Sequence, residues 1–350
     1  MRCVLAPPVA GPPPPDRKAL EAVRHLGRRF PGARVREVPL VRASELDPRA
    51  DASGATRVWL ALEALQVTGS FHVRGALVAL SSARAENVGG GHVVASSLGN
   101  HGIAVAYAAC VLGISATVVV PRTAARTKRE KIERYGAELV VASTDRYDVA
   151  EALAKEIAAG EGARFVSPRE DVNLLLGNGG SLGFEIVRGL GGVPERALAP
   201  FGCGGLATGI AWAFDADGVG PTDRSVWGIQ SEANCAMATS LERGRVVETD
   251  DLPGPTLAEE LAHGVSGDTY ERACGALAGM GVVTETQIAA AMAHAYEDMG
   301  LVLEGSAAVA LAPVLFGLPE GLRGGDVVVV LTGRNIDPDR LDAVLTRARG

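Results

Sequence analysis

The stretch Thr68-Gly69-Ser70-Phe71-His72-Val73-Arg74-Gly75-Ala76 joins a run with strand composition, residues 58–62, to a helix-like run, residues 76–85. Strand-like and helix-like runs alternate on both sides of this stretch, and short connections separate them. Such alternation is typical of a parallel sheet covered by helices on both faces. Further strands are expected at residues 34–41, 92–95, 116–121, 137–141, 164–166, 197–201, 225–231 and 326–331, and further helices at residues 16–29, 103–112, 125–135, 148–159, 183–190, 204–214, 284–299 and 306–315.

Three more blocks place glycine or hydroxyl residues where an expected strand ends. They are Ser96-Ser97-Leu98-Gly99-Asn100-His101, Gly202-Cys203-Gly204-Gly205-Leu206 and Val330-Leu331-Thr332-Gly333-Arg334-Asn335. A Gly-Asn turn that opens a helix presents backbone N–H groups to an anion, and consecutive glycine amides at a helix start suit a phosphate. Taken alone, each of the first two blocks also fits a plain helix cap or a strand-to-helix turn.

The composition is that of a globular chain with no excess of apolar or charged residues. Apolar residues make up 47% of the 350 residues and charged residues 21%, and the net charge is -7. Basic and acidic residues are mixed along the chain, so nothing favours a nucleic-acid partner or an anionic membrane surface. No run reaches the roughly 18 apolar residues of a transmembrane helix. We therefore expect a soluble protein.

The cysteines are an odd number, widely spaced, and form no C-x-x-C pair: Cys3, Cys110, Cys203, Cys235 and Cys274. This pattern argues against a disulfide framework and against a clustered zinc site, so a reducing, cytoplasmic setting is expected. Residues 1–15 lack the long apolar segment of a secretory signal, and we expect them to form a flexible surface arm.

Together the four blocks resemble the threonine dehydratase and serine racemase group, fold type II enzymes that use pyridoxal 5'-phosphate. The opening stretch is similar to that group's block T/V-G-S-F-K-x-R-G-A, and the resemblance runs from about residue 35 to residue 337. It implies an α/β fold of the tryptophan synthase beta type, with two lobes whose twisted, mostly parallel sheets are flanked by helices. Residues 90–165 would form a small inserted lobe and residues 1–89 and 166–350 a large lobe. The resemblance also implies a homodimer.

The resemblance assigns residues of this chain to three roles in one site. The cofactor-binding residues would be Phe71, Asn100, Gly202, Cys203, Gly204, Gly205, Leu206 and Thr332. The carboxylate of the substrate, an amino-acid-like small molecule, would be bound by the loop 96–101 through Ser96, Gly99 and His101. The catalytic residues would be His72, Ser97 and Glu304. Within the first set, the glycine loop would hold the phosphate, Phe71 would back the ring and Thr332 would meet the ring nitrogen.

Several positions depart from the group's pattern. Leu98 stands where racemases of this group place a serine base, so racemisation lacks its second base. Glu259 and Glu260 replace an Asp-Gly pair, and a glutamate in place of that glycine would crowd or charge the pocket. Gln230 and Ala236 stand where the serine racemase branch has metal-binding carboxylates, so no divalent metal is expected.

The largest departure is His72, which occupies the place of the lysine that binds the cofactor covalently in the group. An imidazole has no primary amine that could condense with an aldehyde. The chain contains four lysines, Lys18, Lys128, Lys131 and Lys155, and the motifs place none of them there. Lys128 and Lys131 are expected to be solvated on a charged helix. Pyridoxal phosphate would then be bound without a covalent bond, or not at all.

Three explanations for His72 remain open. The chain is an engineered Lys-to-His variant of a threonine or serine dehydratase, a pseudoenzyme that only binds a ligand or partner, or an enzyme with altered chemistry. In the third case His72 acts as the proton-transfer base, because an imidazole with a pKa of about 6.5 is a competent base near neutrality. The retained phosphate loop, carboxylate loop and Thr332 favour this case. It corresponds to a lyase that eliminates or replaces a β-substituent on a small amino acid or related intermediate.

Overall fold

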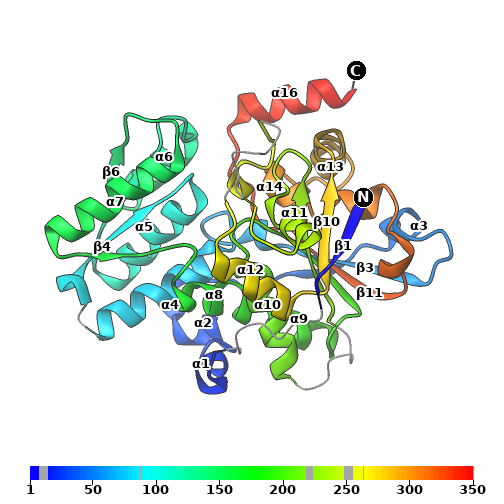
Figure 1. The fold of residues 1–350 in the computed structure, drawn as a ribbon, viewed down its shortest axis with the longest axis horizontal. Helices are drawn as coiled ribbons and strands as arrows, with labels where there is room; N and C mark the ends of the chain where they lie inside the picture. Colours follow the sequence, from blue (N-terminus) through cyan, green and yellow to red (C-terminus); the bar gives the residue numbers. More distant parts are fainter. Residues whose placement is uncertain (8–14, 87, 218–223, 248–254, 263, 350) are drawn as a thin grey trace.

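Two separate sheets, each flanked by helices, organise the chain (Figure 1). The structure is a computed structural model and describes residues 1–7, 15–86, 88–217, 224–247, 255–262 and 264–349. The smaller sheet and its helices lie on the left in Figure 1, and the larger sheet lies on the right. The expected α/β fold with mostly parallel sheets is confirmed.

The larger sheet has the strand order β1-β10-β9-β8-β11-β3-β2. The two edge strands, β1 and β2, run antiparallel to their neighbours, and every other pairing in this sheet is parallel. In β11 the run 327–330 is completely buried, as expected for an interior parallel strand covered on both faces. The strands are β1 Arg2–Leu5, β2 Leu40–Arg42, β3 Thr56–Ala61, β8 Arg196–Pro200, β9 Val226–Ser231, β10 Gly279–Val283 and β11 Gly325–Val330.

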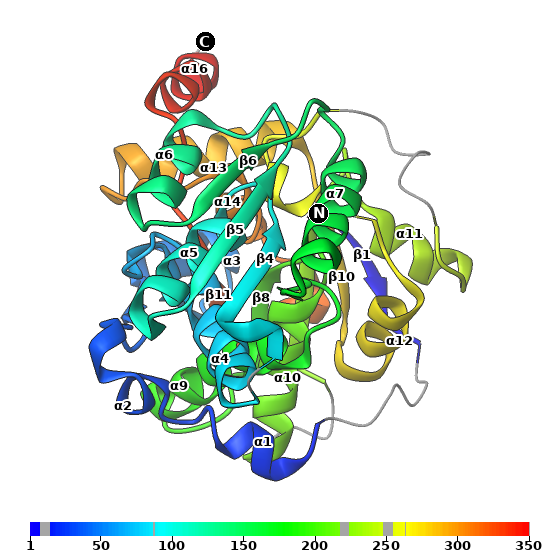
Figure 2. The same ribbon diagram turned by 90° about the vertical axis from the view of Figure 1, so that its left-hand side faces the viewer.

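The smaller sheet is entirely parallel, in the order β6-β5-β4-β7, and faces the viewer in Figure 2. Its strands are β4 His92–Ser96, β5 Ser115–Val120, β6 Glu138–Val141 and β7 Arg164–Phe165. Side chains of β5 alternate between faces: Val118 packs in the cluster with α4 and α5, and Val119 in the cluster with α7. All four strands fall within residues 92–165, although the lobe boundaries at residues 90 and 165 remain a prediction.

The helices follow most of the expected ranges. They are α1 Arg17–Glu21, α2 Leu26–Arg29, α3 Asp47–Ala50, α4 His72–Ala85, α5 Asn100–Leu112, α6 Arg126–Arg134, α7 Tyr147–Glu161, α8 Val172–Leu175, α9 Ser181–Leu190, α10 Gly205–Ala216, α11 Ala236–Arg243, α12 Gly267–Ala276, α13 Glu285–Glu297, α14 Gly305–Ala308, α15 Ala312–Leu315 and α16 Pro338–Arg349. The helix expected at residues 306–315 is interrupted, because Pro313 lies in the first turn of α15 and cannot donate a backbone hydrogen bond.

The N-terminus differs from the flexible arm that the sequence suggested. Arg2–Leu5 forms the edge strand β1 against β10, so that expectation is wrong for these residues, and residues 8–14 lie outside the described residues. Strand β10 was also missed, because glycines interrupt its apolar pattern. One of them, Gly279, permits the close approach of β1, since a Cβ there would lie 2.4 Å from the carbonyl oxygen of Val4.

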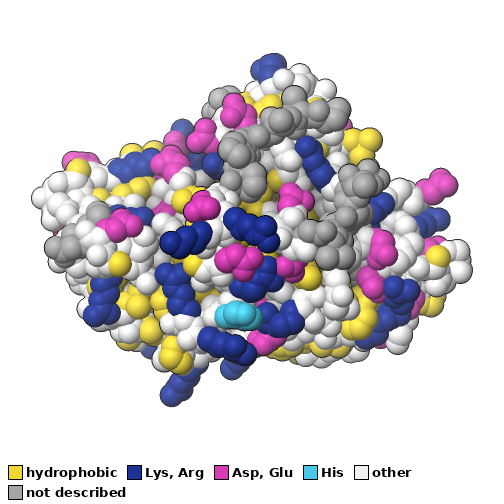
Figure 3. Space-filling model, turned by 90° about the horizontal axis from the view of Figure 1, so that it is seen from below, with side chains coloured by type: hydrophobic (Ala, Val, Ile, Leu, Met, Phe, Trp, Pro, Cys, Tyr) yellow, Lys and Arg dark blue, Asp and Glu magenta, His cyan; other side chains and the backbone are white. Residues whose placement is uncertain are grey.

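The surface carries charges of both signs. Figure 3 shows Lys and Arg side chains interspersed with Asp and Glu side chains over the lower face of the molecule. Within the described ranges, no helix has the length and apolar character needed to cross a membrane.

A fully buried arginine fixes the opening stretch between distant elements. The guanidinium of Arg74, in the first turn of α4, pairs with Glu63 and Glu185 at 2.8 and 2.6 Å. Glu63 follows β3 and Glu185 lies on α9. Because both carboxylates and the guanidinium have almost no exposure, water cannot replace the hydrogen bonds that they make with one another.

Removal of this arginine should destabilise the fold strongly. Arg74→Ala leaves two buried carboxylates without their cation, so the free energy of unfolding should fall by about 3–5 kcal/mol. Urea denaturation measures this change. The control Arg188→Ala breaks an exposed ion pair with Glu37 and should cost less than about 1 kcal/mol. Equal stability losses in the two variants would contradict the anchoring role of Arg74.

Candidate active site

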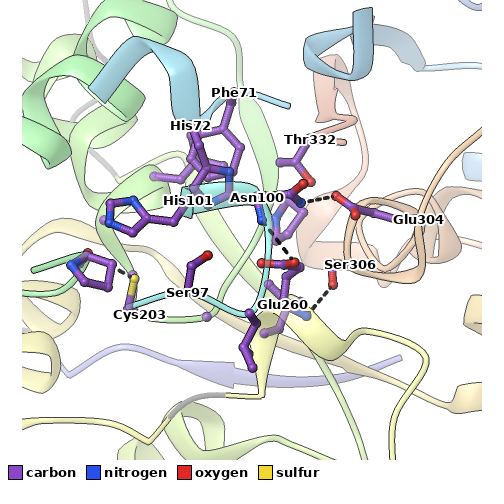
Figure 4. Close-up of a pocket in the computed structure, with 18 of the residues that line it drawn as sticks. Phe71, His72, Ser97, Asn100, His101, Cys203, Glu260, Glu304, Ser306 and Thr332 are labelled. Carbon is purple, nitrogen blue, oxygen red and sulfur yellow. Dashed lines mark hydrogen bonds between the residues drawn. The ribbon is translucent and has the colours of Figure 1, made fainter. Parts of the chain in front are cut away.

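The four sequence blocks meet in one pocket between the two sheets (Figure 4). The predicted site residues that line it are Phe71, His72, Ser96, Ser97, Asn100, His101, Gly202, Cys203, Gly204, Gly205, Leu206, Glu304 and Thr332. Gly99 lies beside the pocket, although it is not part of its lining. The structure therefore brings together residues of the four blocks and Glu304, which come from five separate parts of the chain.

His72 is the first residue of α4, and its ring lies over the pocket beside Phe71. The Phe71 and His72 ring centroids are 3.9 Å apart, and the rings are tilted by 33°. Ser70 Oγ lies 3.3 Å from His72 Nδ1 and fixes the ring orientation. In the tautomer whose Nδ1–H donates to Ser70, Nε2 carries the lone pair and can accept a proton.

The start of α5 forms the pocket wall that the sequence predicted as a carboxylate loop. Ser97 Oγ accepts hydrogen bonds from the backbone N–H groups of Gly99 and Gly102, each at 2.8 Å. Ser97 therefore braces the helix start, and its catalytic role stays a prediction. Burial lowers the pKa of His101 to about 4, so His101 is neutral at pH 7 and offers no positive charge to an anion.

The glycine loop fits a phosphate. Gly204 has φ +80° and immediately precedes α10, and no side chain caps the first turn of that helix. A Cβ at Gly204 would lie 2.8 Å from the Phe201 ring, so only glycine fits there without a shift. Cys203 Sγ, in the pocket lining, donates to the carbonyl of Pro168 at 3.4 Å, and burial raises the pKa of its thiol. The start of a twelve-residue helix thus lies at the pocket without a side-chain cap, as a phosphate site requires.

Lys128 is not the solvated lysine that the helix pattern suggested. Its side chain is buried and lies beneath the loop at Gly99, where a Cβ would sit 2.1 Å from Lys128 Cδ. The Lys128 ammonium donates to Glu260 and lies 3.6 Å from Glu304 Oε2. Burial opposes the charge, yet these two carboxylates raise the pKa of Lys128. The lysine is therefore held as an ammonium ion, which is not a nucleophile.

The other lysines do not reach the pocket lining either. Lys131 is half-buried and donates to Asn335 Oδ1, so the expectation of a solvated side chain is wrong for it as well. Lys18 and Lys155 are exposed. None of the four lysines of the chain lines the pocket that contains His72.

Glu304 belongs to a buried polar chain behind the pocket. Asn100 Nδ2 donates to Glu304 Oε1 at 2.7 Å, and Asn100 Oδ1 accepts from Asn335 at 2.7 Å. The Asn100 amide, predicted to reach the cofactor, is thus engaged with Glu304. Burial raises the pKa of Glu304 to about 7; Glu260 adds to this rise and Lys128 opposes it. Glu304 can therefore hold or release a proton near neutral pH.

The structure adds to the site three polar residues that the sequence did not indicate. Tyr147 and Ser306 line the pocket, and Lys128 supports it from behind. Burial raises the pKa of the Tyr147 hydroxyl, which lies against Ser96. Glu260 was recognisable in the sequence because it stands in place of a glycine, and the structure places it in the pocket wall. Nothing in the helical pattern of residues 125–135 indicates how far the Lys128 side chain reaches.

Comparisons with known proteins agree on one family. The family model described as pyridoxal-phosphate dependent enzyme matches residues 33–333. An L-threonine ammonia-lyase of Thermotoga maritima is 36% identical over 291 residues, which are 83% of this chain and 70% of that protein. A chloroplastic, biosynthetic threonine dehydratase 1 of Solanum lycopersicum is 34% identical over 310 residues, 88% of this chain but only 49% of that protein. Among solved structures, maize serine racemase has a TM-score of 0.83 and 25% identity, and the match covers 96% of this chain and 98% of that chain.

The raised pKa of Glu304 predicts a pH-dependent loss of stability. The unfolded chain releases this proton near pH 4.3, whereas the folded protein retains it up to about pH 7. Between these values the folded state binds more protons, so the contribution of Glu304 to the free energy of unfolding falls as pH rises. In Glu304→Gln this decline should disappear, as urea denaturation at several pH values from about 5 to about 8 would measure.

The matched control is Glu156→Gln, on the exposed side of α7, which should keep the wild-type dependence on pH. A Glu304→Gln variant with the wild-type slope would contradict a proton on Glu304 at pH 6.

Proposed function

The chain belongs to the pyridoxal-phosphate-dependent enzyme family, and on that premise we propose that it is a lyase-like enzyme with an altered mechanism. In this proposal it holds pyridoxal phosphate without a covalent bond. It eliminates or replaces a β-substituent on a small amino acid or a related compound, and His72 is the proton-transfer base. The observation that carries the proposal is the position of the His72 imidazole in the same pocket as the glycine loop.

Different residues around the pocket would bind different parts of pyridoxal phosphate. The amides of the loop 202–206 would hold the phosphate at the start of α10, Phe71 would support the ring and Thr332 would face its nitrogen. When bound, pyridoxal phosphate supplies an electron sink for the carbon that loses a proton. His72 would accept that proton on Nε2. The contact between Ser70 Oγ and His72 Nδ1 would orient the ring for this transfer.

The charge on Glu260 supports the basic role of His72. Glu260 interacts electrostatically with His72 from the opposite wall of the pocket. A nearby carboxylate stabilises the imidazolium that forms once His72 has accepted a proton. Glu304, which titrates near pH 7 and lines the pocket, would supply or take up a second proton there.

A second candidate function is a catalytically silent protein that binds pyridoxal phosphate or an amino compound. It is favoured by Lys128, because the ammonium held by Glu260 and Glu304 cannot replace the missing amine at His72. Both candidates keep the phosphate site and differ only in proton transfer. The expected homodimer and the cytoplasmic location also remain predictions.

Exchange of hydrogen for deuterium at the carbon next to the amine tests the proposal. Holoprotein in D2O should exchange this hydrogen in at least one member of a panel of L-serine, L-threonine, L-serinamide and ethanolamine, as proton NMR would show. His72→Ala should slow the exchange by about 10²- to 10⁴-fold because the base is lost, while the affinity for pyridoxal phosphate should remain similar.

The control is His25→Ala, because His25 is exposed and does not line the pocket. This variant should exchange hydrogen for deuterium at the wild-type rate. An exchange rate unchanged in His72→Ala would refute the role of His72 as base. Bound cofactor with no exchange on any of the four compounds would support the silent protein instead.

A further inference from the structure

The first turn of α5 opens on the pocket, but its amides are largely satisfied by side chains of the protein itself. Ser97 Oγ accepts from Gly99 and Gly102, as described above. The Asn100 N–H donates to Glu260 Oε1 at 3.3 Å. The start of a helix as long as α5, which has thirteen residues, attracts anions. Here a carboxylate of the chain already occupies this position.

Glu260 is held in this position from several sides. Its backbone N–H donates to Ser306 Oγ at 3.0 Å, and its carboxylate accepts from Lys128 Nζ. Glu260 Oε1 would lie 3.0 Å from a Cβ at Gly99, so it sits directly against the loop (Figure 4). The side chain is only 9% exposed. These contacts make Glu260 a fixed part of the pocket wall.

The carboxylate of Glu260 is charged despite its burial. Burial opposes ionisation, but Lys128, His72 and the Asn100 N–H together lower the pKa of Glu260 below its usual value. The chain therefore supplies its own anion at the helix start, and that anion stays ionised at neutral pH.

The other charged groups of the pocket disfavour a second anion at the start of α5. Among the described residues that line it, none is lysine or arginine, whereas Glu260 and Glu304 are both present, and His72, when protonated, already interacts with Glu260. Lys128, the nearest ammonium, is already shared between those two glutamates. A ligand carboxylate beside the α5 start would meet a like charge and would find the Asn100 amide occupied.

We propose that Glu260 takes the place of a ligand carboxylate, so that the pocket selects small amines whose carboxyl group is absent or blocked over free α-amino acids. Amides and esters of small amino acids, and simple amino alcohols, belong to this class. The inference rests on the proposed function, because it concerns the compound that would be bound beside pyridoxal phosphate. It makes Glu260 the residue that determines specificity.

Paired ligands that differ only at the carboxyl group test the inference. Isothermal titration of dialysed holoprotein with L-serine and L-serinamide should give tighter binding of L-serinamide by at least about tenfold, because L-serine adds a like charge beside Glu260. Glu260→Gly removes that carboxylate and frees the helix start, so the affinity for L-serine should rise at least about tenfold.

Two further variants keep the test decisive. Glu260→Gln retains the shape of the side chain without its charge, so the ratio of L-serine to L-serinamide affinity should still rise if Glu260→Gly fails to fold. Glu259→Gln is the control, because Glu259 pairs with Arg340 outside the pocket lining and should leave the preference unchanged.

The outcomes separate this inference from the proposed function. Failure of the protein to retain pyridoxal phosphate on dialysis would count against the proposed function. Retained cofactor with L-serine bound at least as tightly as L-serinamide would overturn the role of Glu260 alone. Binding of neither ligand, both in the wild-type protein and in the two Glu260 variants, would also overturn it.

Discussion

The buried pairing of Arg74 with Glu63 and Glu185 is the constraint on which the site depends. It ties the first turn of α4 to the end of β3 and to α9, with nearest distances of 2.8 and 2.6 Å. His72 lies two residues before Arg74, so the same pairing holds its imidazole over the pocket. A buried ion pair of this kind gains little net stability over apolar packing, but loss of one partner leaves a buried charge uncompensated.

A second buried cluster, Lys128 with Glu260 and Glu304, determines the charge of the opposite wall. Lys128 comes from α6 beside the smaller sheet, whereas Glu260 and Glu304 come from segments that pack on the larger sheet. The cluster therefore joins the two halves of the structure across the pocket. It also explains why the buried Lys128 is charged and why the carboxylate of Glu260 already lies at the start of α5.

The sequence predicted the family, the α/β fold and the convergence of the four blocks, because local motifs and short-range periodicity carry that information. It did not predict β10, where glycines interrupt the apolar pattern, or β1, whose pairing depends on contacts between segments far apart in the sequence. It also placed Lys128 in solvent, since helical periodicity records which face a residue occupies and not where a long side chain ends. Glu260 was recognised as a departure, but its contact with Asn100 needed the three-dimensional arrangement.

The central claim of the proposed function is that no lysine of this protein binds the cofactor covalently. His72 instead occupies the place of that lysine and acts as the proton-transfer base. Borohydride treatment of protein loaded with pyridoxal phosphate, followed by mass spectrometry, tests it directly. We expect the cofactor mass on the native protein, its complete loss on denaturation, and no reduced adduct on any lysine peptide. A stable pyridoxyl adduct on Lys128 or Lys131 would contradict the claim and would identify the amine that replaces the one missing at residue 72.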